Sequence, residues 1–479
     1  MVLVVSPAGL RRMAACASGA GQPLLVGEEL RKKHFSHHSA NVLRVNNGSF
    51  GACPDCVLLE QNKIRKKWFA EPDSEWLQEI PKGIELAREC VAARVAKCPT
   101  EDMVLVDNVT TASSMVSHWL VDSILTEHWA PRGAPAEPKP QPCTVVVLAT
   151  NFNYRAVKLS MERAASRLAS ISQGQIELAI RVVDLPFPIA RENEVVETYA
   201  KALESLKREC AGAVLHLAYL DHIVSLPAMI LPVRALAAMC KGFGFQTVFC
   251  DGAHAPGMIP NLAIPRLCSS SEGDGPYIDM YTANLHKWYF APTSSALFYV
   301  HPKRIDLKRR LHHPLISHNV YADGDTATTC RDGFEGGLAG ECRMIGTRDY
   351  SNFVVLPHAI SFYDRIGGDS VARRNCEMAR EVGGMLSKAW RSGPLGTPPQ
   401  MIGSTCMVGL PEAFGNTYDD AKRLKFDLMK KGIIIQYPVF TEARLFLRVS
   451  VAAYNSFEEY EQLRDAVLKE LSLLNDCNA

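Results

Sequence analysis

The chain has 479 residues, 47% of them hydrophobic, and its 52 basic and 51 acidic residues leave a formal net charge of +1. This is the composition of an ordinary globular protein, and the length favours two packed domains over one. The near balance of charge predicts no nucleic-acid surface. No run of about 18 apolar residues occurs, so no membrane span is expected.

The 15 cysteines are scattered along the chain. The closest pair, Cys53 and Cys56, has no second pair or histidine cluster near it, so no zinc site or other metal site is predicted. Reduced thiols in an intracellular protein are expected instead. Residues 1–27 contain Arg11 and Arg12 and no acidic residue. Such a segment is typical of an organelle transit peptide and equally of a disordered tail, so the cytoplasm, a chloroplast and a mitochondrion all stay open.

Apolar and amphipathic stretches alternate from residue 100 onward. Strands are predicted at residues 104–106, 144–148, 176–183, 213–218, 247–250, 278–282 and 296–300. Helices are predicted at residues 154–171, 194–210 and 226–242, the last opened by Pro227. This alternation predicts an α/β fold with a mostly parallel sheet that helices cover on both faces.

The pattern changes after residue 350. Helices are predicted at residues 352–366, 369–392, 418–431 and 456–474, around strands at 404–410, 433–439 and 444–449. We therefore predict a disordered or targeting segment at 1–34, a large domain at 35–350 and a small α+β domain at 351–479.

Two residues at strand ends point to a particular chemistry. Asp251 directly follows the strand predicted at 247–250, where ligands of open α/β sheets bind. Lys287 follows the next predicted strand and lies between His286 and Trp288. Schiff-base chemistry needs a partly desolvated amine, and pyridoxal phosphate (PLP) also needs a carboxylate beside its ring nitrogen. Either residue alone would be a weak signal, but the pair is a strong one.

The segments around these two residues resemble the class V aminotransferases, which are fold-type I PLP enzymes. The likeness extends from Phe35 to the C-terminus, and the isopenicillin N epimerase-like branch with the plant-type L-cysteine desulfhydrases is the most similar. The motifs that carry it are residues 251–254, 284–288 with 290–292, 46–51, 107–112, 311–314, 346–350, and 448–450 with 454–455. The chain departs from the family pattern at Val109, at Met344 and in the short loop 440–444, which borders the substrate in that family.

The resemblance implies roles for individual residues. Lys287 would bind PLP and remove the Cα proton, Asp251 would pair with the ring nitrogen, and His222 would contact the phenolic oxygen. The further cofactor-binding residues implied are Thr110, Thr111, Ala112, Tyr154, His254, Asn284, His286 and Thr347. The α-carboxylate of a small amino-acid substrate would contact Arg448 and Asn47, because a planar guanidinium binds a carboxylate through two hydrogen bonds. Thr347 resembles the residue that reaches the phosphate of a neighbouring subunit, which implies a homodimer with shared active sites.

The reaction implied is β-elimination from L-cysteine, which yields sulfide, pyruvate and ammonia. A cysteine desulfurase would need a nucleophilic cysteine after the stretch 432–436, and no cysteine occurs between Cys406 and Cys477. Cys330 and Cys342 lie before the motif at 346–350. The sequence also leaves open an amino-acid epimerase, a lyase for a larger conjugate such as hercynylcysteine sulfoxide, and a PLP fold without catalysis.

Overall fold

The structure is a computed structural model that describes residues 25–129, 142–270, 275–317 and 336–478. Its centre is a seven-stranded sheet in the order β2-β10-β9-β8-β5-β3-β4. The strands are β2 (Met103–Val106), β3 (Cys143–Thr150), β4 (Ile176–Val183), β5 (Val214–Asp221), β8 (Thr247–Asp251), β9 (Met280–Asn284) and β10 (Ala296–Val300). All neighbours are parallel except β10, which runs antiparallel to both β2 and β9.

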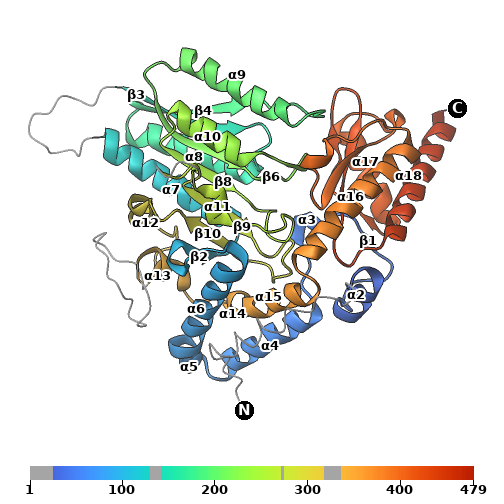
Figure 1. Cartoon of the computed structure of the whole chain (residues 1–479), viewed down its shortest axis with the longest axis horizontal. Coiled ribbons are helices and arrows are strands. Elements are labelled where there is room, and N and C mark those ends of the chain that lie inside the picture. The colour runs from blue at the N-terminus through green and yellow to red at the C-terminus, as the bar shows by residue number, and fades with distance from the viewer. Residues whose placement is uncertain (1–24, 130–141, 271–274, 318–335, 479) are drawn as a thin grey trace, which may run out of the picture.

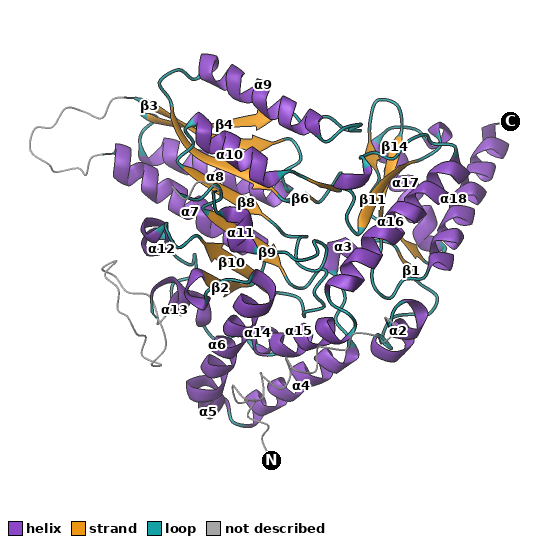
Figure 2. Cartoon of the chain, in the orientation of Figure 1, coloured by secondary structure: helices purple, strands orange, loops and turns teal. Residues whose placement is uncertain are grey.

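Helices cover both faces of this sheet (Figure 2). Successive side chains of a strand point to opposite faces. Val145 and Val147 of β3 accordingly pack with α7 (Val109–His128) and α8 (Arg155–Ile171), whereas Val146 and Leu148 pack with α9 (Asn193–Glu209) and α10 (Val233–Phe243). The prediction of a mostly parallel α/β sheet covered on both faces is thus confirmed.

A smaller unit at the C-terminal end lies beside the large sheet (Figure 1). Its antiparallel sheet has the order β11-β14-β13. The elements are β11 (Thr405–Gly409), β13 (Val439–Phe440) and β14 (Leu445–Ser450), with the helices α16 (Asp369–Trp390), α17 (Tyr418–Lys430) and α18 (Phe457–Asn478). Side chains of these helices and strands form a hydrophobic core of their own.

The N-terminal part of the chain joins the two units. Its helices are α2 (Gly27–His34), α3 (Asn47–Phe50), α4 (Asp55–Ala70), α5 (Pro72–Ser74) and α6 (Ile80–Val91). Strand β1 (Leu43–Arg44) pairs in parallel with β12 (Ile433–Ile434) of the C-terminal unit. Helices α14 (Ser351–Val354) and α15 (Leu356–Arg365) pack on α4 and α6. Residues 351–366 therefore pack with the N-terminal helices, while the division after residue 350 stays a prediction.

Residues 27–34 form α2, and residues 1–24 lie outside the described part of the chain, so the disordered or targeting segment at 1–34 stays a prediction. Two predicted element boundaries are wrong. Pro227 does not open a helix, because it lies in the turn between β6 (Ile223–Val224) and β7 (Met229–Ile230). The strand predicted at 433–439 is divided into β12 and β13. The remaining described α-helices are α11 (Ile264–Cys268), α12 (Ile305–Arg310) and α13 (Gly337–Arg343).

Candidate active site

A cavity of about 280 Å³ lies at the carboxyl ends of β5, β8 and β9. Ligands of parallel α/β sheets bind in this position. Seven of the predicted site residues line it: Thr110, Tyr154, Asp251, His254, Asn284, His286 and Lys287. Residues from four separate stretches of sequence therefore meet around one space, as the resemblance implied.

Asp251 is the last residue of β8 and is buried. Its Oδ1 accepts a hydrogen bond from the backbone N–H of Ala253 (2.8 Å), and its Oδ2 accepts one from the hydroxyl of Tyr219 (3.2 Å). Burial raises the pKa of the Asp251 carboxyl, whereas the Ala253 N–H, the charge of Lys287 and the Tyr219 hydroxyl oppose that rise. The two hydrogen bonds and the nearby amine favour the ionised form.

Lys287 lies in the loop that follows β9, and burial lowers the pKa of its amine to about 8. Asp251 opposes this shift, and Arg448 adds to it. The Lys287 Nζ is 2.9 Å from Nε2 of His254, whose Nδ1 is 3.4 Å from the indole Nε1 of Trp288. Burial and the Lys287 charge lower the pKa of His254 well below its usual value. The loop thus holds an amine whose neutral form is accessible near neutral pH.

Asn284 and His286 hold this loop in place. The side-chain oxygen of Asn284 accepts a hydrogen bond from the backbone N–H of Val109 at the start of α7 (3.1 Å). Nδ1 of His286 is 3.1 Å from the carbonyl of Ser295, so Nδ1 carries the proton and donates. Burial lowers the pKa of His286 to about 4. Both side chains therefore connect the lysine loop to its surroundings and still line the cavity.

The first turn of α7 is only partly free to bind a phosphate. Asn108 caps the helix, and its side-chain oxygen accepts from the N–H of Thr111 (3.0 Å). The N–H of Ala112 donates to the carbonyl of Asn108 (3.3 Å). The N–H of Thr110 has no such partner among the described residues, and Thr110 lines the cavity. Of the three residues predicted here, Thr110 is the one placed to bind an anion.

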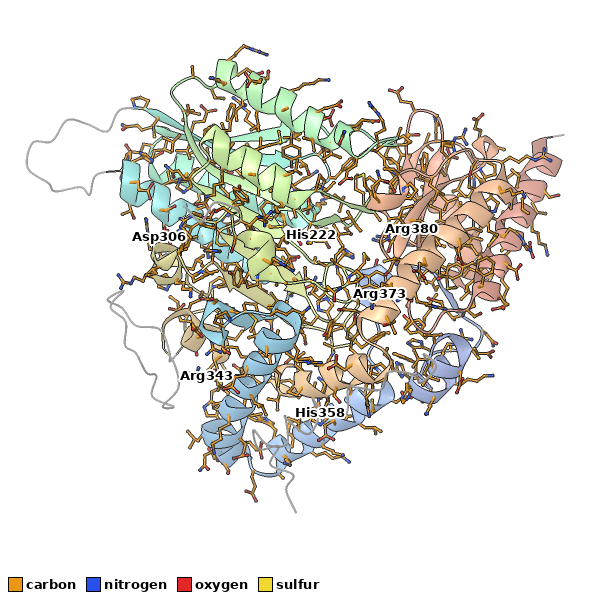
Figure 3. All side chains as sticks on the ribbon, in the orientation of Figure 1. His222, Asp306, Arg343, His358, Arg373 and Arg380 are labelled. Carbon is orange, nitrogen blue, oxygen red and sulfur yellow. The ribbon has the colours of Figure 1, made fainter. Side chains whose placement is uncertain are left out.

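Tyr154 precedes α8, lines the cavity and is 54% exposed. His222 was predicted to reach the cofactor, but it is not among the lining residues. Its Nδ1 is 2.8 Å from the hydroxyl of Tyr281, and it is buried near the middle of the molecule (Figure 3). The neighbouring Asp221 lines the cavity instead. Burial lowers the pKa of His222 to about 4, so this histidine is a neutral interior side chain.

Arg448 is 1% exposed and has no acidic partner in the described part of the chain. Its Nη1 donates to the carbonyl of Ser225 (2.8 Å), and its Nη2 donates to Asn46 Oδ1 (2.5 Å) and Ser49 Oγ (2.8 Å). Its Nε has no hydrogen-bond partner. Burial lowers the pKa of Arg448 to about 10, which leaves the group charged at neutral pH. Ser49 and Ser225 both line the cavity, so an unpaired cation lies directly behind its wall.

The side-chain amide of Asn47 is hydrogen-bonded to other residues of the protein. Its Nδ2 donates to the carbonyl of Ser450 (3.1 Å) and to Asn455 Oδ1 (2.8 Å), and its Oδ1 accepts from Tyr454 (2.8 Å). These bonds engage the amide in holding the N-terminal arm to the C-terminal unit. The preceding residue, Asn46, is the one that contacts Arg448.

The last residue of the motif at 46–51 is a glycine because a side chain there would clash with the lysine loop. Gly51 has a φ of 69°, and a Cβ atom there would lie 1.8 Å from the carbonyl oxygen of His286. A side chain at this position would push the lysine loop away. The motif therefore fits the N-terminal arm closely against the loop that carries Lys287.

Thr347 and the cysteines of the described residues do not line the cavity. Thr347 is exposed and is not a lining residue, while the next residue, Arg348, donates to both oxygens of Asp107. No cysteine lines the cavity within the described residues. Cys342 lies in α13, where burial raises the pKa of its thiol, and Cys330 lies outside the described residues.

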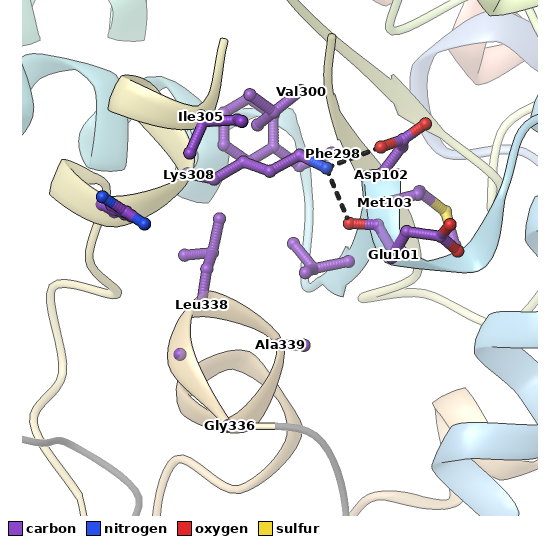
Figure 4. A pocket seen from close by; sticks show the side chains of 13 residues that line it. Glu101, Asp102, Met103, Phe298, Val300, Ile305, Lys308, Gly336, Leu338 and Ala339 are labelled. Atoms are coloured by element: carbon purple, nitrogen blue, oxygen red, sulfur yellow. Dashed lines mark hydrogen bonds and ion pairs between the residues drawn. The ribbon is translucent and has the colours of Figure 1, made fainter. Parts of the chain in front are cut away.

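A second cavity, of about 420 Å³, lies apart from this site between α12, α13 and the sheet edge at β2 and β10 (Figure 4). It contains the ion pair of Lys308 with Asp102 (2.6 Å) and none of the predicted site residues. The described residues contain no group of His, Cys, Asp and Glu that would hold a metal ion. They also contain no helix with the length and apolarity needed to span a bilayer.

The parallel sheet, the smaller C-terminal unit and the lysine–aspartate cavity define the architecture of a fold-type I PLP enzyme. No protein-family model matches the chain, but relatives do. It is 31% identical over 452 residues to L-cysteine desulfhydrase of Arabidopsis thaliana, which covers 90% of this chain and 88% of that protein. The chain therefore belongs to the class V aminotransferase family, whose cofactor is PLP.

Two further comparisons agree with this assignment. The chain is 27% identical over 430 residues to isopenicillin N epimerase of Streptomyces clavuligerus, covering 89% of this chain and 94% of that protein. The structure is similar to the apo cysteine desulfurase of Thermococcus onnurineus NA1, with a TM-score of 0.66 at 16% sequence identity over 94% of this chain and 98% of that one. The similarity to the cysteine desulfurase shows a shared fold.

Proposed function

We propose that the protein is a PLP-dependent carbon–sulfur lyase that converts L-cysteine to sulfide, pyruvate and ammonia by β-elimination. The observation that carries the proposal is the composition of the cavity wall, which offers an amine and a carboxylate but, within the described residues, no thiol. Elimination needs a base and an electron sink, whereas transfer of sulfur to the protein needs a thiolate. Relatives at 31–32% identity bear the name L-cysteine desulfhydrase, which supports the same reaction.

The residues present fit PLP. The N–H and hydroxyl of Thr110 at the start of α7 suit its phosphate, with Asn284 and His286 alongside. Tyr154 offers a ring for stacking, Asp251 suits the ring nitrogen and Lys287 suits the aldehyde carbon. When bound, the cofactor withdraws electrons from the substrate Cα. Lys287, with a pKa of about 8, accepts the Cα proton, and Asp251 stabilises positive charge at the ring nitrogen.

Arg448 supports an amino-acid substrate. A buried guanidinium without an acidic partner is costly until an anion joins it, because an unpaired charge is poorly solvated in the interior. A substrate α-carboxylate would provide that anion by replacing the hydrogen bonds that Arg448 donates to Ser49 and Ser225 at the cavity wall.

The experiment is to incubate purified, PLP-loaded protein with L-cysteine, D-cysteine and larger S-conjugates while sulfide, pyruvate and racemisation are assayed together. The proposal expects sulfide and pyruvate from L-cysteine in equal amounts. Racemisation without sulfide would identify an epimerase, and turnover only of the larger conjugates would identify a sulfoxide lyase. Alanine as the carbon product would identify a desulfurase. The double variant with Cys330→Ser and Cys342→Ser should stay active.

A further inference from the structure

Gln436 is the one residue of the smaller C-terminal unit among the described residues that line the cavity. It is half-buried and follows β12, which pairs in parallel with β1. The N–H of Val45 donates to the carbonyl of Ile434 (3.2 Å), and Asn46, the next residue of the arm, contacts Arg448. Because the two strands run in the same direction, Gln436 and Asn46 leave the strand pair at the same end.

The side-chain amide of Gln436 has a defined orientation. Its Oε1 accepts a hydrogen bond from the backbone N–H of Tyr437 (3.2 Å). An amide oxygen accepts such a bond and an amide nitrogen does not, so Nε2 is the free end. It carries two N–H donors and has no hydrogen-bond partner in the part of the chain that the structure describes. The loop itself is held, because the ring of Tyr437 stacks on Tyr418 and the Lys425 Nζ lies 3.7 Å from the centre of that ring.

A substrate amino acid brings three groups to the cavity: its amine, its α-carboxylate and its side chain. In the proposed function the amine goes to the aldehyde carbon at Lys287 and the carboxylate goes to Arg448. Ser49 and Ser225 belong to the carboxylate end, because both accept hydrogen bonds from Arg448. The Ser49 hydroxyl also donates to Asn46 (2.8 Å), and the Ser225 hydroxyl oxygen lies 3.5 Å from the Arg448 Nη1. The two serines are therefore engaged where the carboxylate would bind.

The remaining polar side chains of the wall lie at the cofactor end. Nε2 of His254 contacts the Lys287 amine and its Nδ1 contacts Trp288, while Asp221 accepts a hydrogen bond from Asn153. The others lie at the carboxyl ends of β8 and β9 or at the starts of α7 and α8: Asn108, Thr110, Tyr154, Asp251, Asn284 and His286. Gln436 is therefore the donor that is left for the side chain of the substrate.

We propose that Gln436 determines the preference for a sulfur leaving group, because an N–H of its amide donates a hydrogen bond to the substrate sulfur as it departs. In the net elimination the electron pair of the Cα–H bond becomes the Cα–Cβ double bond, and the proton goes to Lys287. The sulfur leaves as hydrosulfide with the electron pair of the Cβ–S bond. A neutral thiol is a weak acceptor and the departing anion is a strong one, so the donor acts mainly on the transition state. This inference rests on the proposed function and deepens it.

The experiment compares L-cysteine with β-chloro-L-alanine in the PLP-loaded wild type, Gln436→Ala and Gln436→Glu, with pyruvate release as the measurement. Chloride is a far weaker base than hydrosulfide, so its departure depends little on a donor. Gln436→Ala should lower kcat for L-cysteine by about 10-fold or more with little change in KM, and leave kcat for β-chloro-L-alanine within about twofold. Gln436→Glu keeps an acceptor for the Tyr437 N–H but places a negative charge beside the departing anion, so it should lower kcat for L-cysteine further.

Lys425→Met is the matched control, because it removes the cation over the Tyr437 ring and leaves the amide of Gln436 in place. A change that only loosens the loop should alter both reactions alike, so the ratio of the two kcat values should stay at the wild-type value in this variant.

Two outcomes overturn the role of Gln436: an equal loss with both substrates in Gln436→Ala, and no loss with either. If Gln436→Ala does not fold, Gln436→Glu carries the same comparison, and an undiminished kcat for L-cysteine in that variant overturns the role as well. Wild-type protein that releases pyruvate from β-chloro-L-alanine but no sulfide from L-cysteine refutes the proposed function itself, before any variant is compared.

Discussion

The Nζ of Lys287 lies 2.9 Å from Nε2 of His254, and this contact suits an uncharged amine. The indole N–H of Trp288 only donates, so Nδ1 of His254 accepts from it (3.4 Å). The proton of the neutral imidazole is then on Nε2, which donates to Lys287. Only an uncharged amine accepts such a hydrogen bond, so the three side chains together favour the nucleophilic form of the lysine.

PLP should therefore bind at a rate that depends on pH. Burial holds the pKa of Lys287 at about 8, so the neutral fraction, and with it the binding rate, should rise about tenfold per pH unit up to pH 8 and level off above it. Stopped-flow absorbance after addition of PLP to apoenzyme measures this. Lys287→Ala should lack the visible absorbance and the turnover. A rate that is flat below pH 8, or absorbance that persists in the variant, would contradict the assignment.

Trp288→Phe should shift the same profile upward. Without the indole N–H, His254 is free to carry its proton on Nδ1, and Nε2 then accepts a hydrogen bond from the charged ammonium. The midpoint of the binding rate should rise by about one pH unit, because a hydrogen bond to the charged form is gained. Tyr289→Phe is the matched control, since Tyr289 follows directly and stacks on Tyr363 away from the amine. Equal profiles for both variants would refute the role of the indole.

Asp251→Asn should keep bound PLP but reduce turnover by about 10²- to 10⁴-fold, the range typical of a positioned charge. The physical reason is that an amide does not stabilise a proton on the ring nitrogen. Steady-state rates at saturating substrate, with cofactor content measured in the same preparation, provide the test. Near-normal turnover would mean that another residue pairs with the nitrogen.

Asp251 and Lys287 were predictable because each follows a buried strand, and the carboxyl ends of parallel strands meet at one edge of the sheet. At two positions the residue next to the predicted one has the contact: Asp221 lines the cavity where His222 does not, and Asn46, rather than Asn47, contacts Arg448. Asp221 ends β5, and successive side chains of a strand point to opposite faces, so a one-residue offset there exchanges a cavity residue for an interior one. Sequence patterns also do not reveal strand direction, and the antiparallel β10 was therefore not anticipated.

Arg448→Lys should raise KM for the amino acid by about 10- to 100-fold with a smaller effect on kcat, which corresponds to the loss of about 1.5–3 kcal/mol from a charge-assisted contact. Lysine keeps the charge but lacks the planar pair of donors. The control is Arg444→Lys directly before β14, where Arg444 binds Glu412 (2.7 Å). If KM is unchanged in Arg448→Lys, or if both variants behave alike, Arg448 does not bind the substrate carboxylate.

The active sites should be shared between two subunits. Thr347 is exposed and does not line the cavity of its own chain, while Phe50 and Tyr154 at that cavity are 78% and 54% exposed. An exposed hydroxyl and an open cavity rim are consistent with a partner that supplies the missing phosphate contact. Thr347→Asp should therefore be inactive, because its carboxylate would repel the phosphate of the neighbouring site.

Mixing inactive Thr347→Asp with inactive Lys287→Ala tests this directly. In a mixed dimer, the cavity with an intact Lys287 receives an intact Thr347 from its partner, while the other cavity carries both changes. With random exchange, half of the dimers are mixed and each has one good site, so about a quarter of the wild-type activity should return. Mixing Lys287→Ala with Asp251→Asn is the control, since both residues belong to one cavity and no activity should return. If exchange is shown by mass spectrometry and the first mixture stays inactive, the sites are not shared.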